Sequence, residues 1–241
     1  MTGFSYDIDE GHGLPRLGLV VLQVDETIEP EFRIHFGPAD AALHVSRVPS
    51  GDDLTPDTID DMATALPRAA GLLPQAAPFD VLAYACTSAS MRFGPDRVAD
   101  LLRQGARARH VTNPFSAALA AFDHLGVRRI GLVSPYIDSV AGPMAQAFGA
   151  AGVEVVQSLS FGEREEARVA RITRASVEAA ALQVAGDDAV EAVFLSCTNL
   201  RTADFIEDLR QRSGKPVISS NLALAWDMGR LSGCARRTSL A

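Results

Sequence analysis

The sequence predicts an α/β fold of two pseudo-symmetric, Rossmann-like α/β/α halves, each with a parallel four-stranded sheet, and an active site between them. Short apolar runs alternate with helical patterns along the 241 residues, which is typical of parallel sheets covered by helices. The segment Arg16–Val21 (RLGLVV) recurs as Arg129–Ser134 (RIGLVS). A Cys-Thr pair ends an apolar run in each half, at Cys86 and at Cys197.

The repeated features keep the same order and nearly the same separation. Gly18 and Gly131 are 113 residues apart along the chain, and Cys86 and Cys197 are 111 residues apart. Two landmarks at one offset indicate a duplicated unit of about half the chain. We therefore expect a first half of residues 1–114 plus 218–241, and a second half of residues 115–217.

In the first half, an irregular lead-in over residues 1–15 precedes a strand at 17–22. The loop after this strand opens a helix, with Asp25 as the expected N-cap. Phe115, Leu119 and Phe122 fall at helical spacing, so 115–125 is expected to be a helix that packs on the sheet. The other elements expected here are strands at 42–48, 81–85 and 110–112 and helices at 55–73 and 96–104.

The second half opens at Arg129 with a strand that ends in Ser134-Pro135-Tyr136. The same alternation of apolar runs and helical patterns continues from there to a polar tail at 234–241. The elements expected in chain order are a helix at 141–150, a strand at 153–157, a long helix at 165–184, a strand at 192–196, a helix at 202–212, a strand at 217–219 and a helix at 221–231.

The composition excludes several classes of function. A net charge of −8 argues against a nucleic-acid partner. No apolar run approaches the roughly 20 residues that span a bilayer, and the polar start is unlike a signal peptide. Three cysteines and five histidines fall in no disulfide or metal-ligand spacing. We expect a cytoplasmic protein with free thiols, no bound metal and no membrane contact.

The two Cys-Thr pairs carry the predicted chemistry. In open α/β sheets, ligands bind at the carboxyl ends of the strands. A thiol there that faces a helix N-terminus has its thiolate stabilised by the amide groups and the helix dipole. Two such thiols at one cleft, Cys86 and Cys197, suit proton transfer on opposite faces of a carbon next to a carboxylate, as in racemisation. The groups expected to hold the substrate carboxylate and the developing enolate are those of Thr87, Ser88, Thr198 and Asn199.

The alternative is that both cysteines are small core residues, because free cysteine is often buried and inert. Cys234, in the polar tail, has no partner motif and is assigned to that structural role.

The motifs Cys-Thr-Ser at 86–88, Cys-Thr-Asn at 197–199 and Gly-Leu-Val-Ser-Pro-Tyr at 131–136 resemble the aspartate/glutamate racemase superfamily. Within it, the chain is most similar to the maleate isomerase and arylmalonate decarboxylase branch. Asn-Pro-Phe-Ser-Ala at 113–117, with Ser-Ser-Asn at 219–221, is more specifically similar to proteins of ectoine utilisation, the EutA-like group. The resemblance extends from about Gly18 to Leu231.

This resemblance implies roles for individual residues. Cys86 would be the nucleophile or base on one face of the substrate, and Cys197 the acid or base on the other. Tyr136 would lie over the substrate carboxylate, unless it is an interfacial aromatic residue at a strand end. The resemblance also implies that no metal or organic cofactor takes part, and that the protein is a homodimer or tetramer.

The sequence departs from the maleate isomerase pattern at two positions. Asp25 stands where those enzymes have an asparagine after the first strand, and Glu165-Glu166 replaces a second asparagine. A carboxylate repels a second substrate carboxylate by up to a few kcal/mol in a partly desolvated site. Asp25 and Glu166 as substrate ligands would therefore favour a neutral or cationic distal end, as in an N-acetylated diaminobutyrate. Alternatively, Asp25 is a helix cap and Glu165-Glu166 a solvated first turn. Arg47 is either a ligand of a substrate carboxylate or a surface residue.

The sequence thus predicts a cofactor-independent racemase or isomerase, whose substrate is a small amino-acid derivative or a dicarboxylate. One alternative is a maleate cis–trans isomerase that acts through a covalent Cys86 adduct. Another is a decarboxylase, although such relatives typically keep only one of the two cysteines. The last is a non-catalytic small-molecule binding protein, since two α/β halves around a cleft also describe receptors.

Overall fold

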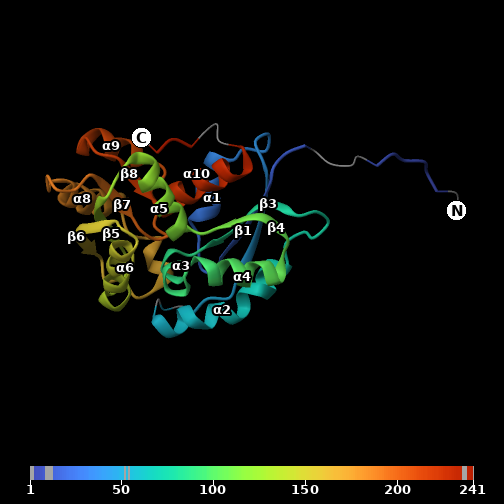
Figure 1. Ribbon diagram of the computed structural model, residues 1–241, viewed down its shortest axis with the longest axis horizontal. Coiled ribbons are helices and arrows are strands. Elements are labelled where there is room, and N and C mark those ends of the chain that lie inside the picture. Colours follow the sequence, from blue (N-terminus) through green and yellow to red (C-terminus); the bar gives the residue numbers. More distant parts are fainter. Residues whose placement is uncertain (1–2, 9–12, 52, 54, 235–237, 241) are drawn as a thin grey trace.

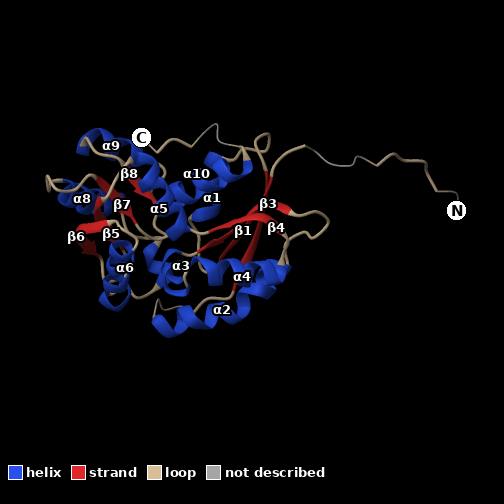
Figure 2. Cartoon of the chain, in the orientation of Figure 1, coloured by secondary structure: helices blue, strands red, loops and turns tan. Residues whose placement is uncertain are grey.

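The chain forms two parallel sheets of four strands each (Figures 1 and 2). The structure, a computed structural model, describes residues 3–8, 13–51, 53, 55–234 and 238–240. The strand orders are β2-β1-β3-β4 and β6-β5-β7-β8, so the second sheet repeats the topology of the first. The predicted fold class, with its duplicated α/β unit, is confirmed.

The first sheet is built around two central strands, β1 and β3, that are apolar at most positions. In β1 and β3, almost every residue is buried, as expected for parallel strands with both faces covered. The elements of this half are β1 (Arg16–Leu22), α1 (Ile28–His35), β2 (Ala42–Val48), α2 (Pro56–Gly71), β3 (Phe79–Ala85), α3 (Thr87–Phe93), α4 (Pro95–Gly105) and β4 (Ala108–Thr112).

The second sheet follows the same plan. Its central strands, β5 and β7, pair with each other and are also buried. The elements from there on are α5 (Pro114–Leu125), β5 (Arg129–Ser134), α6 (Asp138–Ala150), β6 (Glu154–Ser160), α7 (Glu166–Val169), α8 (Arg174–Ala185), β7 (Ala192–Leu195), α9 (Ile206–Ser213), β8 (Val217–Ser219) and α10 (Ser220–Ser232).

The glycines of the repeated motif have the same function in both halves. A Cβ atom on Gly18 would lie 2.8 Å from Leu82 Cδ1, and one on Gly131 would lie 2.8 Å from Val184 Cγ2. Real Cβ atoms essentially never approach another atom so closely. Glycine is therefore needed at both positions so that neighbouring side chains can pack against the central strand.

Two helices connect the halves. Figure 1 shows α5 and α10 between the two sheets. They pack against each other, and α10 also contacts β3 and β4 of the first sheet as well as β8, from which it starts. This arrangement brings the carboxyl ends of β3 and β7 toward the same interface.

The sequence prediction was wrong for the long helix at 165–184. The structure has the short helix α7 and then α8. The Thr173 side chain accepts a hydrogen bond from the Ser176 N–H at 3.3 Å and so caps α8, which starts a new helix in the middle of the predicted one. The predicted helix at 202–212 begins later, at Ile206. No helix among the described residues has the length and apolar character of a membrane span.

Candidate active site

The two cysteines lie at the carboxyl ends of equivalent central strands. Cys86 follows β3 and is the N-cap of α3, and Cys197 follows β7 closely. Both are buried, with exposed fractions of 3% and 5%. Ser220 Oγ accepts hydrogen bonds both from the Cys197 N–H and from Thr87, the residue after Cys86, and Thr198 contacts Ala85, the residue before Cys86. The structure thus brings the two predicted catalytic thiols together.

Cys197 has an unusual backbone conformation. Its φ is +121°, and no other non-glycine residue in the described part of the chain has a positive φ. Such a conformation costs about 1–3 kcal/mol and persists only where surrounding contacts enforce it. The Cys197 N–H donates to Ser220 Oγ at 3.0 Å, which is one such contact. The expectation that Cys197 faces the following helix was wrong, since α9 begins only at Ile206.

Hydroxyl groups from both halves surround the thiols. Thr87 Oγ1 donates to Ser220 Oγ at 2.8 Å. Thr198 Oγ1 donates to the Ala85 carbonyl at 3.3 Å, and Ser88 Oγ lies 3.6 Å from Cys86 Sγ. Thr87, Ser88 and Thr198, all expected to bind substrate, therefore lie in one buried cluster that joins the two Cys-Thr motifs.

Ser88 also lines a cavity of about 240 Å³, which is bounded by residues of α2, α3 and α6. These helices belong to different halves, so the cavity lies at their interface. It extends from the surface to a residue that contacts Cys86.

Tyr136 is buried beside the same cluster, with 1% of its surface exposed. Its hydroxyl oxygen accepts a hydrogen bond from Ser196 Oγ at 3.4 Å. Burial, followed by negative charge on Cys197, raises the pKa of Tyr136 well above its ordinary value. The phenol is therefore a neutral hydrogen-bond donor close to both thiols.

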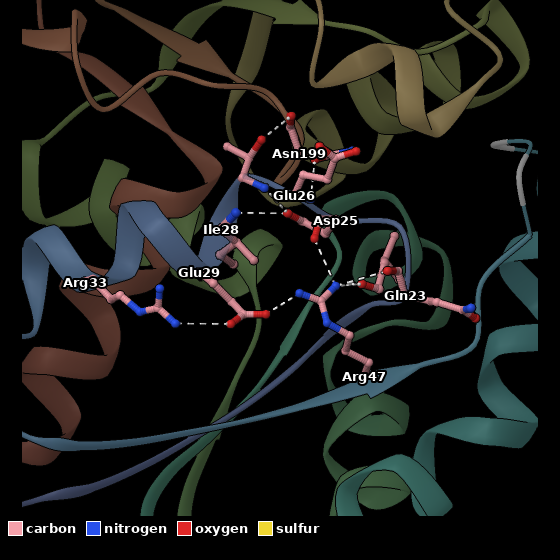
Figure 3. Close-up of polar contacts among 10 residues, drawn as sticks. Gln23, Asp25, Glu26, Ile28, Glu29, Arg33, Arg47 and Asn199 are labelled. Carbon is pink, nitrogen blue, oxygen red and sulfur yellow. Dashed lines mark hydrogen bonds and ion pairs between the residues drawn. The ribbon is translucent and has the colours of Figure 1, made fainter.

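Asp25 lies in the loop between β1 and α1 (Figure 3) and is only 2% exposed. Its Oδ1 accepts from the N–H groups of Thr27 and Ile28 at 2.8 and 2.9 Å. Asp25 thus caps α1 as predicted, although the N-cap position itself belongs to Thr27. Asp25 Oδ2 is buried and has no hydrogen-bond partner within the described residues. One oxygen therefore stabilises the helix, and the other remains unused.

Arg47 holds this loop in place instead of lying free for a substrate (Figure 3). Its Nη2 pairs with Glu29 of α1. Its Nη1 donates to three backbone carbonyls, those of Leu22 at 3.0 Å, Gln23 at 3.1 Å and Asp25 at 3.0 Å. The guanidinium therefore fixes the end of β1 and the backbone of Asp25.

Glu166, at the start of α7, brings a second carboxyl group to the cluster. Its Oε1 accepts from Cys197 Sγ at 3.9 Å, and its Oε2 is buried without a partner among the described residues. Burial, followed by the negative charge of Asp25, raises the pKa of Glu166 to about 8. The alternative of a solvated first turn is wrong for Glu166, which is 2% exposed, but fits the exposed Glu165.

The Asn199 side chain connects the segment of Asp25 with the segment of Glu166. Its Oδ1 accepts from the Glu26 N–H at 3.0 Å (Figure 3), and its Nδ2 donates to the Glu166 carbonyl at 3.0 Å. The amide is thus occupied within the protein. The Asn199 backbone N–H interacts with Cys197 and lowers the pKa of that thiol, so this residue acts on the site through its main chain.

Burial acts against the predicted stabilisation of the two thiolates. Burial raises the pKa of Cys86 to about 11, although the Ala89 N–H and the Ser88 hydroxyl oppose the shift. Burial and the charge of Glu166 raise the pKa of Cys197 well above its ordinary range. Desolvation outweighs the local hydrogen bonds, so both groups are neutral thiols until something else stabilises a thiolate.

Sequence reasoning missed Ser220 and Glu31. Ser220 accepts hydrogen bonds from both Cys-Thr motifs. Glu31 Oε1 accepts from the N–H groups of Thr202 and Ala203 at 2.7 and 2.9 Å, and its Oε2 accepts from Asn221 Nδ2 at 2.8 Å. The segment Ser219–Asn221 was noticed only as part of the family resemblance, and a single glutamate in a helix gives no signal that it is buried.

In the described chain, no group of three or more His, Cys, Asp or Glu residues could hold a metal ion.

Comparisons with known proteins agree with this architecture. Residues 50–240 match the family model for arylmalonate decarboxylase. A maleate isomerase from Geobacillus stearothermophilus is 29% identical over 156 residues, 58% of this chain and 59% of that protein. The arylmalonate decarboxylase of Bordetella bronchiseptica is 33% identical over 125 residues, 51% of each chain. A maleate isomerase from Nocardia farcinica is 26% identical over 229 residues, 90% of each chain. The first two alignments thus span only about half to three fifths of those relatives.

Solved structures show the same fold. A liganded double mutant of arylmalonate decarboxylase is 26% identical, with a TM-score of 0.81 over 93% of this chain and 95% of that one. A Nocardia farcinica maleate cis-trans isomerase mutant with a covalently bound succinylcysteine intermediate is 24% identical, with a TM-score of 0.81 over 91% and 93% of the two chains.

Proposed function

Since the chain belongs to the arylmalonate decarboxylase family, we propose that it is a cofactor-independent enzyme that moves a proton at a carbon next to a carboxylate. The observation that carries this proposal is the pair of buried thiols. Cys86 and Cys197 lie at equivalent strand ends in the two halves, where Ser220 Oγ joins their Cys-Thr motifs through two hydrogen bonds. A racemase needs an acid and a base on opposite faces of one carbon, and a two-fold repeated unit supplies that arrangement.

The proposed reaction exchanges one proton for another. A thiolate removes the proton from the carbon, and the electron pair of the broken C–H bond moves into the carboxylate to form an enolate. The opposite thiol then gives its proton to the other face of that carbon, which restores the carboxylate and leaves the second sulfur as a thiolate. The donors that would stabilise the enolate are the hydroxyl groups of Ser88 and Tyr136, because the hydroxyl protons of Thr87 and Thr198 are donated to Ser220 and to the Ala85 carbonyl.

The raised thiol pKa values imply that a thiolate forms only together with substrate binding, with the thiol proton released to solvent. Cys86 ionises more readily, because the Ala89 N–H and the Ser88 hydroxyl lower its pKa. Cys197 lies against Glu166, whose charge opposes its ionisation. We therefore assign the first proton abstraction to Cys86 and the proton donation to Cys197.

Proton NMR in D₂O tests this function. Maleate, both enantiomers of aspartate and glutamate, a phenylmalonate and both N-acetyl-diaminobutyrate enantiomers would be incubated with the wild type. Loss of one α-proton signal is expected, and Cys86→Ser and Cys197→Ser should each slow it by about 10³-fold or more. Cys234→Ser, remote from the cluster, is the control. Exchange that survives in both variants would contradict the two-thiol mechanism, and binding without exchange would favour the receptor alternative.

Cis–trans isomerisation of maleate is the second candidate. It is favoured by the maleate isomerase relatives, one of which aligns over 90% of this chain. In this reaction, Cys86 Sγ would bond to one alkene carbon while the other carbon takes the proton of Cys197. Rotation about the resulting single bond, followed by the reverse steps, gives fumarate. Mass spectrometry of Cys197→Ser incubated with maleate would show a covalent adduct only under this mechanism.

Three further predictions accompany the proposed function. An origin in ectoine utilisation, a cytoplasmic location and a homodimer or tetramer stay predictions from the resemblance and the composition.

A further inference from the structure

Two buried carboxyl groups meet next to the thiols, one from each half of the chain. Asp25 comes from the loop after β1 and Glu166 from the start of α7. Each is about 2% exposed, and the charge of Asp25 raises the pKa of Glu166, so the two lie within electrostatic reach. Glu166 in turn contacts Cys197.

Each carboxyl group uses one oxygen within the protein and leaves the other unused. Asp25 Oδ1 caps α1, and Glu166 Oε1 accepts from the Cys197 thiol. Asp25 Oδ2 and Glu166 Oε2 are buried, and neither oxygen has a hydrogen-bond partner among the described residues. The Thr198 hydroxyl lowers the pKa of Asp25 and the Asn199 amide lowers that of Glu166, but neither outweighs burial. Buried polar atoms of folded proteins nearly always have a partner, so two such acceptors at a candidate active site point to a ligand.

No cation inside the described structure neutralises the pair. Neither carboxylate forms an ion pair with a described residue, and the nearby Arg47 directs its guanidinium to Glu29 and to backbone carbonyls. The charge of Arg47 is only the smallest of the effects on the pKa of Asp25. In the folded protein a proton on Glu166 relieves the pair of one charge, because burial and the charge of Asp25 raise the pKa of Glu166 to about 8. A cation that binds here takes the place of that proton.

We propose that Asp25 Oδ2 and Glu166 Oε2 form an ammonium subsite, which binds a protonated amine at the distal end of the substrate. The inference rests on the proposed function and specifies its substrate class. An ammonium group has three N–H donors and a positive charge, which match two unpaired acceptors of negative charge. A second carboxylate in this place would instead face two carboxylates. The substrate is accordingly a short-chain amino acid with a second amine, and the subsite disfavours dicarboxylates, including the maleate of the second candidate reaction.

The subsite also connects substrate recognition with the chemistry. The charge of Glu166 is the second largest cause, after burial, of the raised pKa of Cys197. An ammonium group bound against the ionised form of Glu166 offsets that charge, so binding of the correct substrate makes proton exchange at Cys197 easier. A substrate without the amine lacks this effect.

Isothermal titration calorimetry with a matched set of ligands tests the subsite. The ligands share one amino-acid head and differ at the distal end. They are 2,4-diaminobutyrate with an ammonium, its Nγ-acetyl derivative with an uncharged N–H, 2-aminobutyrate with a methyl group, and aspartate with a carboxylate. Wild-type protein should bind 2,4-diaminobutyrate at least tenfold more tightly than each of the other three.

Variants show whether the two carboxylates cause this preference. The double variant Asp25→Asn/Glu166→Gln should lose the preference for 2,4-diaminobutyrate. Glu166→Gln alone, which leaves the α1 cap intact, should reduce this preference. Glu26→Gln/Glu165→Gln removes the same charge from the neighbouring exposed side chains and should keep it. Equal binding of aspartate or of the acetyl derivative, or no binding of 2,4-diaminobutyrate, would overturn the inference.

The same samples in D₂O separate the inference from the proposed function. Preference for 2,4-diaminobutyrate without α-proton exchange would keep the subsite and refute the racemase reaction. If the α-proton of aspartate exchanges, and aspartate binds as tightly as 2,4-diaminobutyrate, two-thiol proton transfer would stand and the ammonium subsite would be refuted.

Discussion

At the scale of single residues, the burial of Glu166 makes the stability of the protein depend on pH. Its pKa is raised from 4.5 to about 8, so the unfolded chain loses this proton at lower pH than the folded chain. The contribution of Glu166 to stability is therefore complete below about pH 4.5 and is lost as the pH rises through about 8.

The variant Glu166→Gln removes this dependence. Its free energy of unfolding relative to the wild type should increase on the order of a few kcal/mol between pH 5 and pH 8.5. Urea denaturation at both pH values measures the difference, with Glu165→Gln as the exposed control. A constant difference between Glu166→Gln and wild type would show that Glu166 titrates normally.

The backbone of Cys197 allows a second test. At a φ of +121° a side chain is strained, whereas glycine is not. Cys197→Gly should therefore be more stable than Cys197→Ala by about 1 kcal/mol. At Cys86, where φ is −146°, the order should reverse. The urea midpoints of the four glycine and alanine variants measure this order. A Cys197→Gly variant that is less stable than Cys197→Ala would mean that the backbone of Cys197 is unstrained.

At the scale of elements, the loop between β1 and α1 depends on Arg47, whose guanidinium holds three carbonyls and Glu29. Arg47→Met leaves these acceptors unpaired and should cost about 1–3 kcal/mol of stability, together with weaker substrate binding. Arg47→Lys lacks the planar fork and should not restore either property. The control is Arg33→Met, which removes only an exposed partner of Glu29 at 3.6 Å. If Arg47→Met resembles Arg33→Met, the loop does not depend on Arg47.

The elements also show what the sequence could and could not predict. Apolar periodicity located all eight strands and most helices, because burial on both faces leaves a continuous apolar run in the sequence. It missed the break at Thr173, where a single side-chain cap starts the new helix α8 and ends the predicted continuous helix. It also placed no helix directly after Cys86, although α3 begins at Thr87, since the small residues there fit several conformations.

The sequence predicted where the residues of the candidate site lie better than it predicted their pKa values. Strand ends placed Cys86 and Cys197 correctly, because topology determines which edge they reach. The direction of their pKa shifts was predicted wrongly, since burial depends on segments distant in sequence. For the same reason, the cap at Asp25 was predictable from its neighbours, whereas the unpaired second oxygen was not.

At the scale of the whole molecule, Glu31 connects the two halves. It lies on α1 and accepts two backbone N–H groups at Thr202 and Ala203. Glu31→Met leaves the buried N–H of Thr202 and the half-buried N–H of Ala203 without a partner and should destabilise the protein by about 2–4 kcal/mol. Glu207→Met makes the same change on an exposed part of α9. Thermal unfolding compares the two, and equal stability would show that the contact contributes little to the joining of the halves.

The central claim is that the two thiols act on opposite faces of one substrate carbon, where one removes a proton and the other donates one. The most direct measurement is the isotopic course of the first turnover in D₂O, with a single enantiomer of 2,4-diaminobutyrate and chiral separation of the products by mass spectrometry. A two-thiol reaction places deuterium in the inverted enantiomer, while the recovered starting enantiomer keeps its protium. Deuterium in the recovered enantiomer at the same rate, or protium retained in the inverted one, would show that a single base serves both faces and would contradict the account.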